Sequence, residues 1–150
     1  MPYLSESSAK VVTEFFREDL DDPSFELPRV IFATGRTASV VARSLRIHGI
    51  TIGRLVIIAP HLVERVDGRA VLPRDLIVHE TTHVLQYREY GFVRFLWKYF
   101  GDYLRNLKSE GNYSLDARNA AYVAIPFEVE ARQTAYRFVR WYSKRRRSAS

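Results

Sequence analysis

The pattern of apolar and polar positions predicts a chain that is mostly helical at its two ends. Apolar residues recur at helical spacing in six segments, which we predict as helices: 5–20, 37–45, 74–90, 92–107, 117–125 and 126–143. The third of these has the clearest limits, because Pro73 precedes it and Gly91 follows it. Proline suits the first turn of a helix and glycine suits its end, so this helix is expected to cover residues 74–90.

Short apolar runs between these helices predict strands. Arg29–Thr34 is rich in β-branched and aromatic residues, and two more apolar runs follow on either side of Gly53. Asp67-Gly68 is a strong turn signal. Together these segments predict an α+β fold, in which a small, mainly antiparallel sheet precedes the helix over 74–90 and the C-terminal helices.

Composition narrows the class of protein. With 150 residues and 47% hydrophobic content, the chain is expected to form a single domain over residues 1–150. It contains no cysteine, so disulfides and thiolate ligands are excluded and any metal must be held by His, Asp or Glu. The sequence shows neither a signal peptide nor a membrane-spanning run, and a cytoplasmic location is the default expectation.

The net charge of +6 is concentrated near the C-terminus, where Lys144–Arg147 are all basic. Such a run favours a solvated helix end that complements the helix dipole. An alternative is contact with nucleic acid or anionic lipid, which predicts binding that weakens with salt. The sequence offers no strong evidence for either partner.

The segment His79-Glu80-Thr81-Thr82-His83 is an HExxH motif inside a predicted helix. Residues four apart share one helix face, so both imidazoles can bind the same metal ion. Glu80 is then placed to take a proton from a water molecule as a general base. The spacing predicts two metal ligands and a base on one and a half helical turns.

A catalytic zinc site usually has a third protein ligand. The candidates are His48, His61 and the carboxylates Glu128 and Glu130. On a helix the two glutamates point about 200° apart, so only one of them can face the metal. We choose Glu128, because it shares its stripe with small alanines that allow close packing against the motif helix, and Glu130 remains the second choice.

Two segments of the chain resemble a known protein family. The segments HETTHVLQY (79–87) and PFEVEAR (126–132), with a Tyr/Phe-rich helix between them, are similar to the small bacterial zinc-metallopeptidase-like domains called DUF4157, and more distantly to gluzincins. The resemblance covers roughly residues 30–135. A helical extension over 1–28 and a basic tail over 144–150 lie outside it.

The resemblance implies a minimal zincin-like domain with Zn²⁺ held by His79, His83 and Glu128, and with Glu80 as catalytic base. Many relatives have Asp where this chain has Arg132, which puts the orientation of one zinc-binding histidine in doubt. In zinc peptidases, an extended substrate pairs with an edge strand, for which we choose Leu55–Ile58. The expected partner is a peptide or protein substrate.

The resemblance leaves the oxyanion-stabilising residue open among Tyr87, Tyr113 and Tyr122. We favour Tyr122, which lies six residues before the proposed third ligand.

Two further questions remain open on the sequence alone. The alternative to a peptidase is a catalytically silent metal-binding domain that acts as an assembly, interaction or toxin-associated module, since such domains occur as pieces of larger systems. The helical extension over 1–28 either covers the cleft as a removable segment or packs as part of the core. We favour the core, because Phe15, Phe16 and Leu20 need burial.

Overall fold

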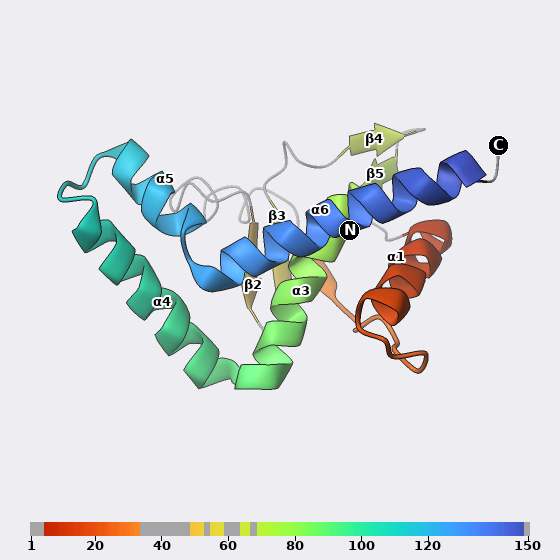
Figure 1. Cartoon of the computed structure of the whole chain (residues 1–150), viewed down its shortest axis with the longest axis horizontal. Coiled ribbons are helices and arrows are strands. Elements are labelled where there is room, and N and C mark those ends of the chain that lie inside the picture. The colour runs from red at the N-terminus through yellow and green to blue at the C-terminus, as the bar shows by residue number, and fades with distance from the viewer. Residues whose placement is uncertain (1–4, 34–48, 53–54, 59–63, 67–68, 149–150) are drawn as a thin grey trace.

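A computed structural model shows how these segments are arranged (Figure 1). The residues that it describes are 5–33, 49–52, 55–58, 64–66 and 69–148. The predicted helix over 37–45, the two candidate ligands His48 and His61, and the predicted turns at Gly53 and at 67–68 lie outside these ranges.

Five helices make up most of the described structure. They are α1 (Glu6–Asp19), α3 (Arg74–Tyr90), α4 (Phe92–Ser109), α5 (Leu115–Val123) and α6 (Pro126–Ser148). Gly91 separates α3 from α4 with a φ of 76°, a conformation that side-chain-bearing residues rarely adopt, and its N–H donates to the carbonyl of Tyr87 at 3.0 Å. The bounds of the motif helix α3 therefore follow from Pro73 and Gly91, as predicted.

The strands are only three or four residues long. Strands β1 (Ile31–Ala33), β3 (Leu55–Ile58) and β2 (Gly49–Ile52) form one sheet in that order, with β1 parallel and β2 antiparallel to β3. Strands β4 (Glu64–Val66) and β5 (Arg69–Val71) form a separate antiparallel pair.

The predicted α+β fold with a mainly antiparallel sheet is wrong. The described structure is predominantly helical, and its short strands do not form the layer that an α+β domain requires. The larger of the two sheets is also mixed rather than antiparallel. The apolar runs between the helices are too short to build a sheet that covers the long amphipathic helices, so helix–helix packing dominates.

The predicted edge strand is also wrong. Leu55–Ile58 forms β3, which is paired on both sides by β1 and β2. Four consecutive apolar residues are typical of a strand that is enclosed by neighbours, whereas an edge strand usually alternates with polar residues.

The N-terminal helix α1 belongs to the main core, which confirms the second of the two roles considered for it. Phe15 contacts Phe138 and Trp141 of α6 edge-to-face, with ring centroids 5.3 and 5.7 Å apart. The buried residues of this core come from α1, β3, α3, α6 and two connecting segments: Val12, Phe15, Phe16, Phe25, Val56, Leu72, Ile77, Val78 and Phe138. Figure 1 shows α1 beside the C-terminal end of α6, far from the start of that helix.

The basic C-terminal residues continue α6 as far as Ser148. Arg145 lies 3.0 Å from Glu18 and 3.5 Å from Glu14 of α1, and Arg137 makes a bidentate pair with Asp19 at 2.7 and 2.8 Å. These pairs are largely exposed, so each contributes little to stability. They show that part of the positive charge is compensated within the molecule.

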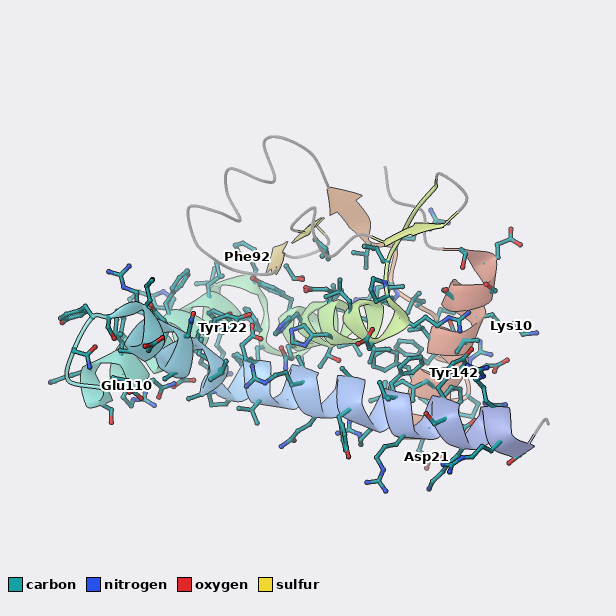
Figure 2. The ribbon with its side chains drawn as sticks, turned by 90° about the horizontal axis from the view of Figure 1, so that it is seen from above. Lys10, Asp21, Phe92, Glu110, Tyr122 and Tyr142 are labelled. Atoms are coloured by element: carbon teal, nitrogen blue, oxygen red, sulfur yellow. The ribbon has the colours of Figure 1, made fainter. Side chains whose placement is uncertain are left out.

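Helices α4 and α5 form a hairpin at the end of the molecule opposite α1 (Figures 1 and 2). The chain then returns through α6, which runs along α3 in an extensive contact. Within the described residues, no helix combines the length and the apolar character needed to cross a membrane.

Candidate metal centre

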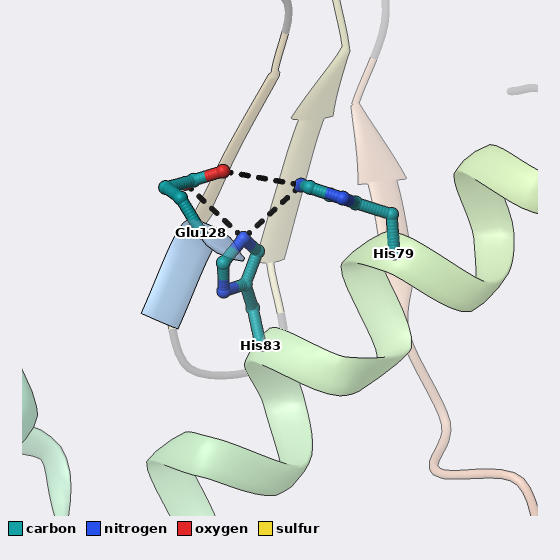
Figure 3. Close-up of side chains that lie close together, drawn as sticks. All are labelled: His79, His83 and Glu128. Carbon is teal, nitrogen blue, oxygen red and sulfur yellow. Dashed lines mark hydrogen bonds and ion pairs between the residues drawn. The ribbon is translucent and has the colours of Figure 1, made fainter. Parts of the chain in front are cut away.

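The two histidines of the HExxH motif lie one turn apart on the same face of α3. Their Nε2 atoms are 3.2 Å apart, and the rings meet edge-to-face (Figure 3). This is the arrangement expected for positions i and i+4 of a helix. Both imidazoles point toward the first turn of α6.

Glu128 completes the cluster from α6. Its carboxylate oxygens lie 3.4 Å from Nε2 of His79 and 3.2 Å from Nε2 of His83 (Figure 3). The side chain is buried, with 3% of the residue exposed. Because Pro126 begins α6, Glu128 falls in its first turn, where the helix dipole favours a negative charge.

The three side chains fit a metal ion. In a tetrahedral zinc site with ligand distances of about 2.0–2.1 Å, two ligand atoms lie about 3.3 Å apart. The two histidine nitrogens are 3.2 Å apart, and one ligand atom from each of the three residues lies within 4.8 Å of the others. In addition, Oε2 of Glu128 is buried without a hydrogen-bond partner among the described residues. His79, His83 and Glu128 could therefore hold a metal ion.

The electrostatics of the cluster favour a charged carboxylate. Burial alone would raise the pKa of Glu128, but its close contacts with His79 and His83 and the charge of His83 hold that pKa well below its usual range. Burial would lower the pKa of His83, yet its hydrogen bond to Glu128 and the charges of Glu128 and Glu80 outweigh burial and raise it. Glu128 is thus in the ionised form that binds metals.

Gln86 sets the orientation of His83. Its amide nitrogen donates to the carbonyl of Phe127 at 3.1 Å and to Oε2 of Glu130 at 2.8 Å, so its oxygen is left to accept from Nδ1 of His83 at 2.8 Å. The proton of the neutral ring therefore sits on Nδ1, and the lone pair of Nε2 points into the cluster.

This contact fills the supporting role that was in doubt at Arg132. Instead of an Asp, an arginine lies there, with Nη1 3.9 Å from Oε2 of Glu128 and Nη2 donating to the carbonyl of Val123. The chain supports a histidine from Gln86, one turn further along the motif helix.

The structure separates the two candidate glutamates. Glu128 faces the histidines, whereas Glu130 is exposed and contacts Gln86. Glu130 therefore lies behind the cluster and fixes the orientation of Gln86. The helical geometry that set the two side chains about 200° apart accounts for this difference.

Glu80 is buried beside the cluster. Only 4% of the residue is exposed, and its Oε2 accepts a hydrogen bond from the hydroxyl of Thr51 on β2. Its charge is one of the causes that raise the pKa of His83. Glu80 also follows His79 directly in α3, so its carboxylate lies next to the cluster.

Tyr99 is a site residue that the sequence did not reveal. Its hydroxyl donates to Oε1 of Glu128 at 2.8 Å. In the sequence, Tyr99 is one of several aromatic residues of the Tyr/Phe-rich helix between the two motifs. No local signal distinguishes it, because the contact depends on how α4 folds back against α6.

The three tyrosines considered for the oxyanion lie in different places. Tyr122 lies on α5 (Figure 2) and packs, partly buried, against the cluster of Tyr87, Phe95, Ile125 and Phe127; burial, followed by the charge of Glu128, raises its pKa. Tyr87 packs on Phe95 with ring centroids 3.9 Å apart, and burial raises its pKa to about 12. Tyr113 lies 74% exposed between α4 and α5.

Replacing Tyr99 by Phe is expected to weaken any binding of zinc by the cluster about 10- to 100-fold, because Oε1 of Glu128 loses the donor that holds it. A competition titration against a chromophoric chelator measures the change. Tyr103→Phe is the matched control, since Tyr103 packs against Leu107, Ala117 and Ala121 on the same helix hairpin. Equal zinc affinity in the Tyr99→Phe variant and the parent would contradict this role.

Comparison with known proteins identifies the family. A family model described as the eCIS core domain matches residues 12–91, which is more than half of the chain. No curated protein and no solved structure matches the chain. The match begins within α1, so most of the helix that we placed outside the resemblance is included, and it ends at Gly91, before Tyr99 and Glu128. The chain belongs to the eCIS core domain family, the DUF4157-like family that its motif resembles.

Proposed function

We propose that the chain is a zinc-dependent metallopeptidase that hydrolyses peptide bonds, with Glu80 as the general base. The observation that carries the proposal is the buried carboxylate of Glu80 beside the His79–His83–Glu128 cluster. A three-residue site of histidines and a carboxylate, with an acid–base group next to it, is typical of catalytic rather than structural zinc.

The residues of the site divide the chemistry between them. When bound, zinc acts as a Lewis acid toward water and the scissile carbonyl. Glu80 accepts a proton from the attacking water as the new C–O bond forms, and it donates that proton to the leaving amine nitrogen as the C–N bond breaks. Thr51 holds the Glu80 side chain in place through its hydroxyl.

Tyr122 is the proposed donor to the oxyanion. Burial and the charge of Glu128 raise its pKa, so its hydroxyl keeps its proton at neutral pH and can donate a hydrogen bond. Tyr99 is less suited to this role because its hydroxyl already donates to Glu128.

The position of β2 supports a peptide as the substrate. This strand lies at an edge of the described three-stranded sheet, and its Thr51 contacts the proposed catalytic base. An extended peptide that paired with the outer edge of β2 would therefore pass next to Glu80. Among the described strands, β2 replaces β3 as the candidate for substrate pairing.

Chelation tests the proposal directly. The zinc-loaded protein is expected to cleave an unstructured protein substrate, seen as new amino termini by mass spectrometry. A chelator should abolish cleavage and added zinc should restore it. Zinc at one ion per chain without any cleavage would instead favour the silent metal-binding module.

A further inference from the structure

Helix α4 has an apolar outer face as well as its packed inner face. The inner face carries buried or partly buried residues such as Phe95 and Tyr99, which contact the rest of the molecule. The outer face carries a stripe of large apolar side chains at spacings of four, three and four residues: Val93, Trp97, Phe100 and Leu104. These residues are 67%, 78%, 58% and 62% exposed. We call them the outer stripe.

The regular spacing of the outer stripe distinguishes it from isolated apolar residues on a protein surface. Residues three and four apart lie above one another on a helix, so the four side chains form one continuous row of roughly 16 Å. Single exposed apolar residues are common, but a contiguous row with two aromatic rings marks an interaction surface. Helix α4 lies at one end of the molecule (Figures 1 and 2), and the exposed fractions of the four side chains show that the stripe is accessible.

Basic residues border the outer stripe. Arg94, Lys98 and Arg105 lie along one side of it and Lys108 lies at its end, and all four are exposed. The one acidic residue of α4, Asp102, is buried and accepts a hydrogen bond from Arg105 at 2.9 Å. The accessible face of the helix is therefore aromatic, aliphatic and positively charged.

We propose that the outer stripe docks onto the surface of an anionic lipid membrane, with α4 lying in the plane of the interface. Trp, Phe, Leu and Val side chains can enter the acyl boundary, while the long Arg and Lys side chains extend to the headgroup phosphates. The positive border complements anionic lipid, whereas a second copy of the same face would present a border of the same sign. This inference is independent of the proposed peptidase activity.

Co-sedimentation with vesicles tests the proposal. The parent protein should bind vesicles of phosphatidylcholine with about 30% phosphatidylserine, and binding should fall as salt is raised. Vesicles of phosphatidylcholine alone should bind it much more weakly. The double variant Trp97→Ser/Phe100→Ser should bind at least about tenfold less, because two inserted rings are lost.

A second pair of exposed residues provides the control. Tyr136 and Val139 on α6 are 64% and 45% exposed, and Arg140 lies over the Tyr136 ring. The variant Tyr136→Ser/Val139→Ser should bind like the parent. Tryptophan fluorescence provides a second readout. Anionic vesicles should shift the emission of the parent to shorter wavelength as Trp97 inserts, and this shift should be absent in Trp97→Phe, a conservative variant that keeps the fold.

Three results would overturn the proposal. The parent fails to sediment with anionic vesicles, or the Trp97→Ser/Phe100→Ser variant binds as tightly as the parent. In the third result, neither protein binds vesicles, and the parent is a dimer whereas the variant is a monomer. The outer stripe would then be an interface between two copies of the chain.

Discussion

Replacement of Glu128 by glutamine is expected to remove zinc from the purified protein. The substitution keeps the size of the side chain but removes the negative charge between His79 and His83. Loss of a direct ligand should weaken binding by more than the roughly 10- to 100-fold that a supporting residue contributes. Elemental mass spectrometry should find near-stoichiometric zinc in the parent and little in the variant.

The matched control is Glu130→Gln. A glutamine at that position still offers an oxygen to the amide of Gln86, so zinc content should stay near that of the parent. The reverse result, in which Glu130→Gln loses zinc and Glu128→Gln retains it, would move the third ligand to Glu130. Absence of zinc from the parent after zinc is supplied would rule out the proposed peptidase.

Replacement of Glu80 by glutamine is expected to reduce peptide hydrolysis by about 10²- to 10⁴-fold while zinc stays bound. The introduced amide retains an oxygen that can accept from the hydroxyl of Thr51, so the local structure should persist. The loss should therefore appear in the catalytic rate rather than in metal content. Hydrolysis of a peptide, measured beside zinc stoichiometry in the same preparation, separates the two.

Glu89→Gln is the control for this experiment. Glu89 lies exposed on the same helix, so its replacement changes the charge by the same amount and should leave hydrolysis unchanged. A Glu80→Gln variant that hydrolyses peptides at the parent rate would show that another group takes the proton. Loss of zinc from Glu80→Gln would show a structural role for Glu80 instead.

Local sequence signals predicted the described helices well. Pro73 and Gly91 set the limits of α3, and the spacing of His79 and His83 placed both rings on one face of it. Pro126 likewise set the start of α6. These features depend on residues close together in the chain, for which helical periodicity and end signals are sufficient.

Contacts between distant segments were not predictable in the same way. The position of β3 in the centre of its sheet depends on pairing with two other strands, and short apolar runs do not specify their partners. The Tyr99–Glu128 hydrogen bond depends on the angle at which α4 folds back against α6. Only part of the role of Gln86 was predictable. Gln86 lies three residues after His83 on the same helix, but the acceptors of its amide, Phe127 and Glu130, lie on α6.

The family match covers only part of the candidate metal site. It includes the motif helix but stops at Gly91, so Glu128 comes from a part of the chain that the match does not cover. The matched segment therefore supplies two histidines and the proposed base, and the C-terminal helices supply the carboxylate. A fragment that ends at residue 91 would lack the third side chain of the cluster.

Because the cluster is divided between α3 and α6, an ion bound there would stabilise the contact between these two helices. His83 and Glu128 stand on either side of the α4–α5 hairpin, so one ion joining them acts as a removable cross-link that closes a long loop. An ion that binds the folded chain more tightly than the unfolded chain shifts the folding equilibrium by mass action. The fraction of folded chains would then rise with the concentration of the bound ion, and removal of the ion would leave more unfolded chain open to proteolysis.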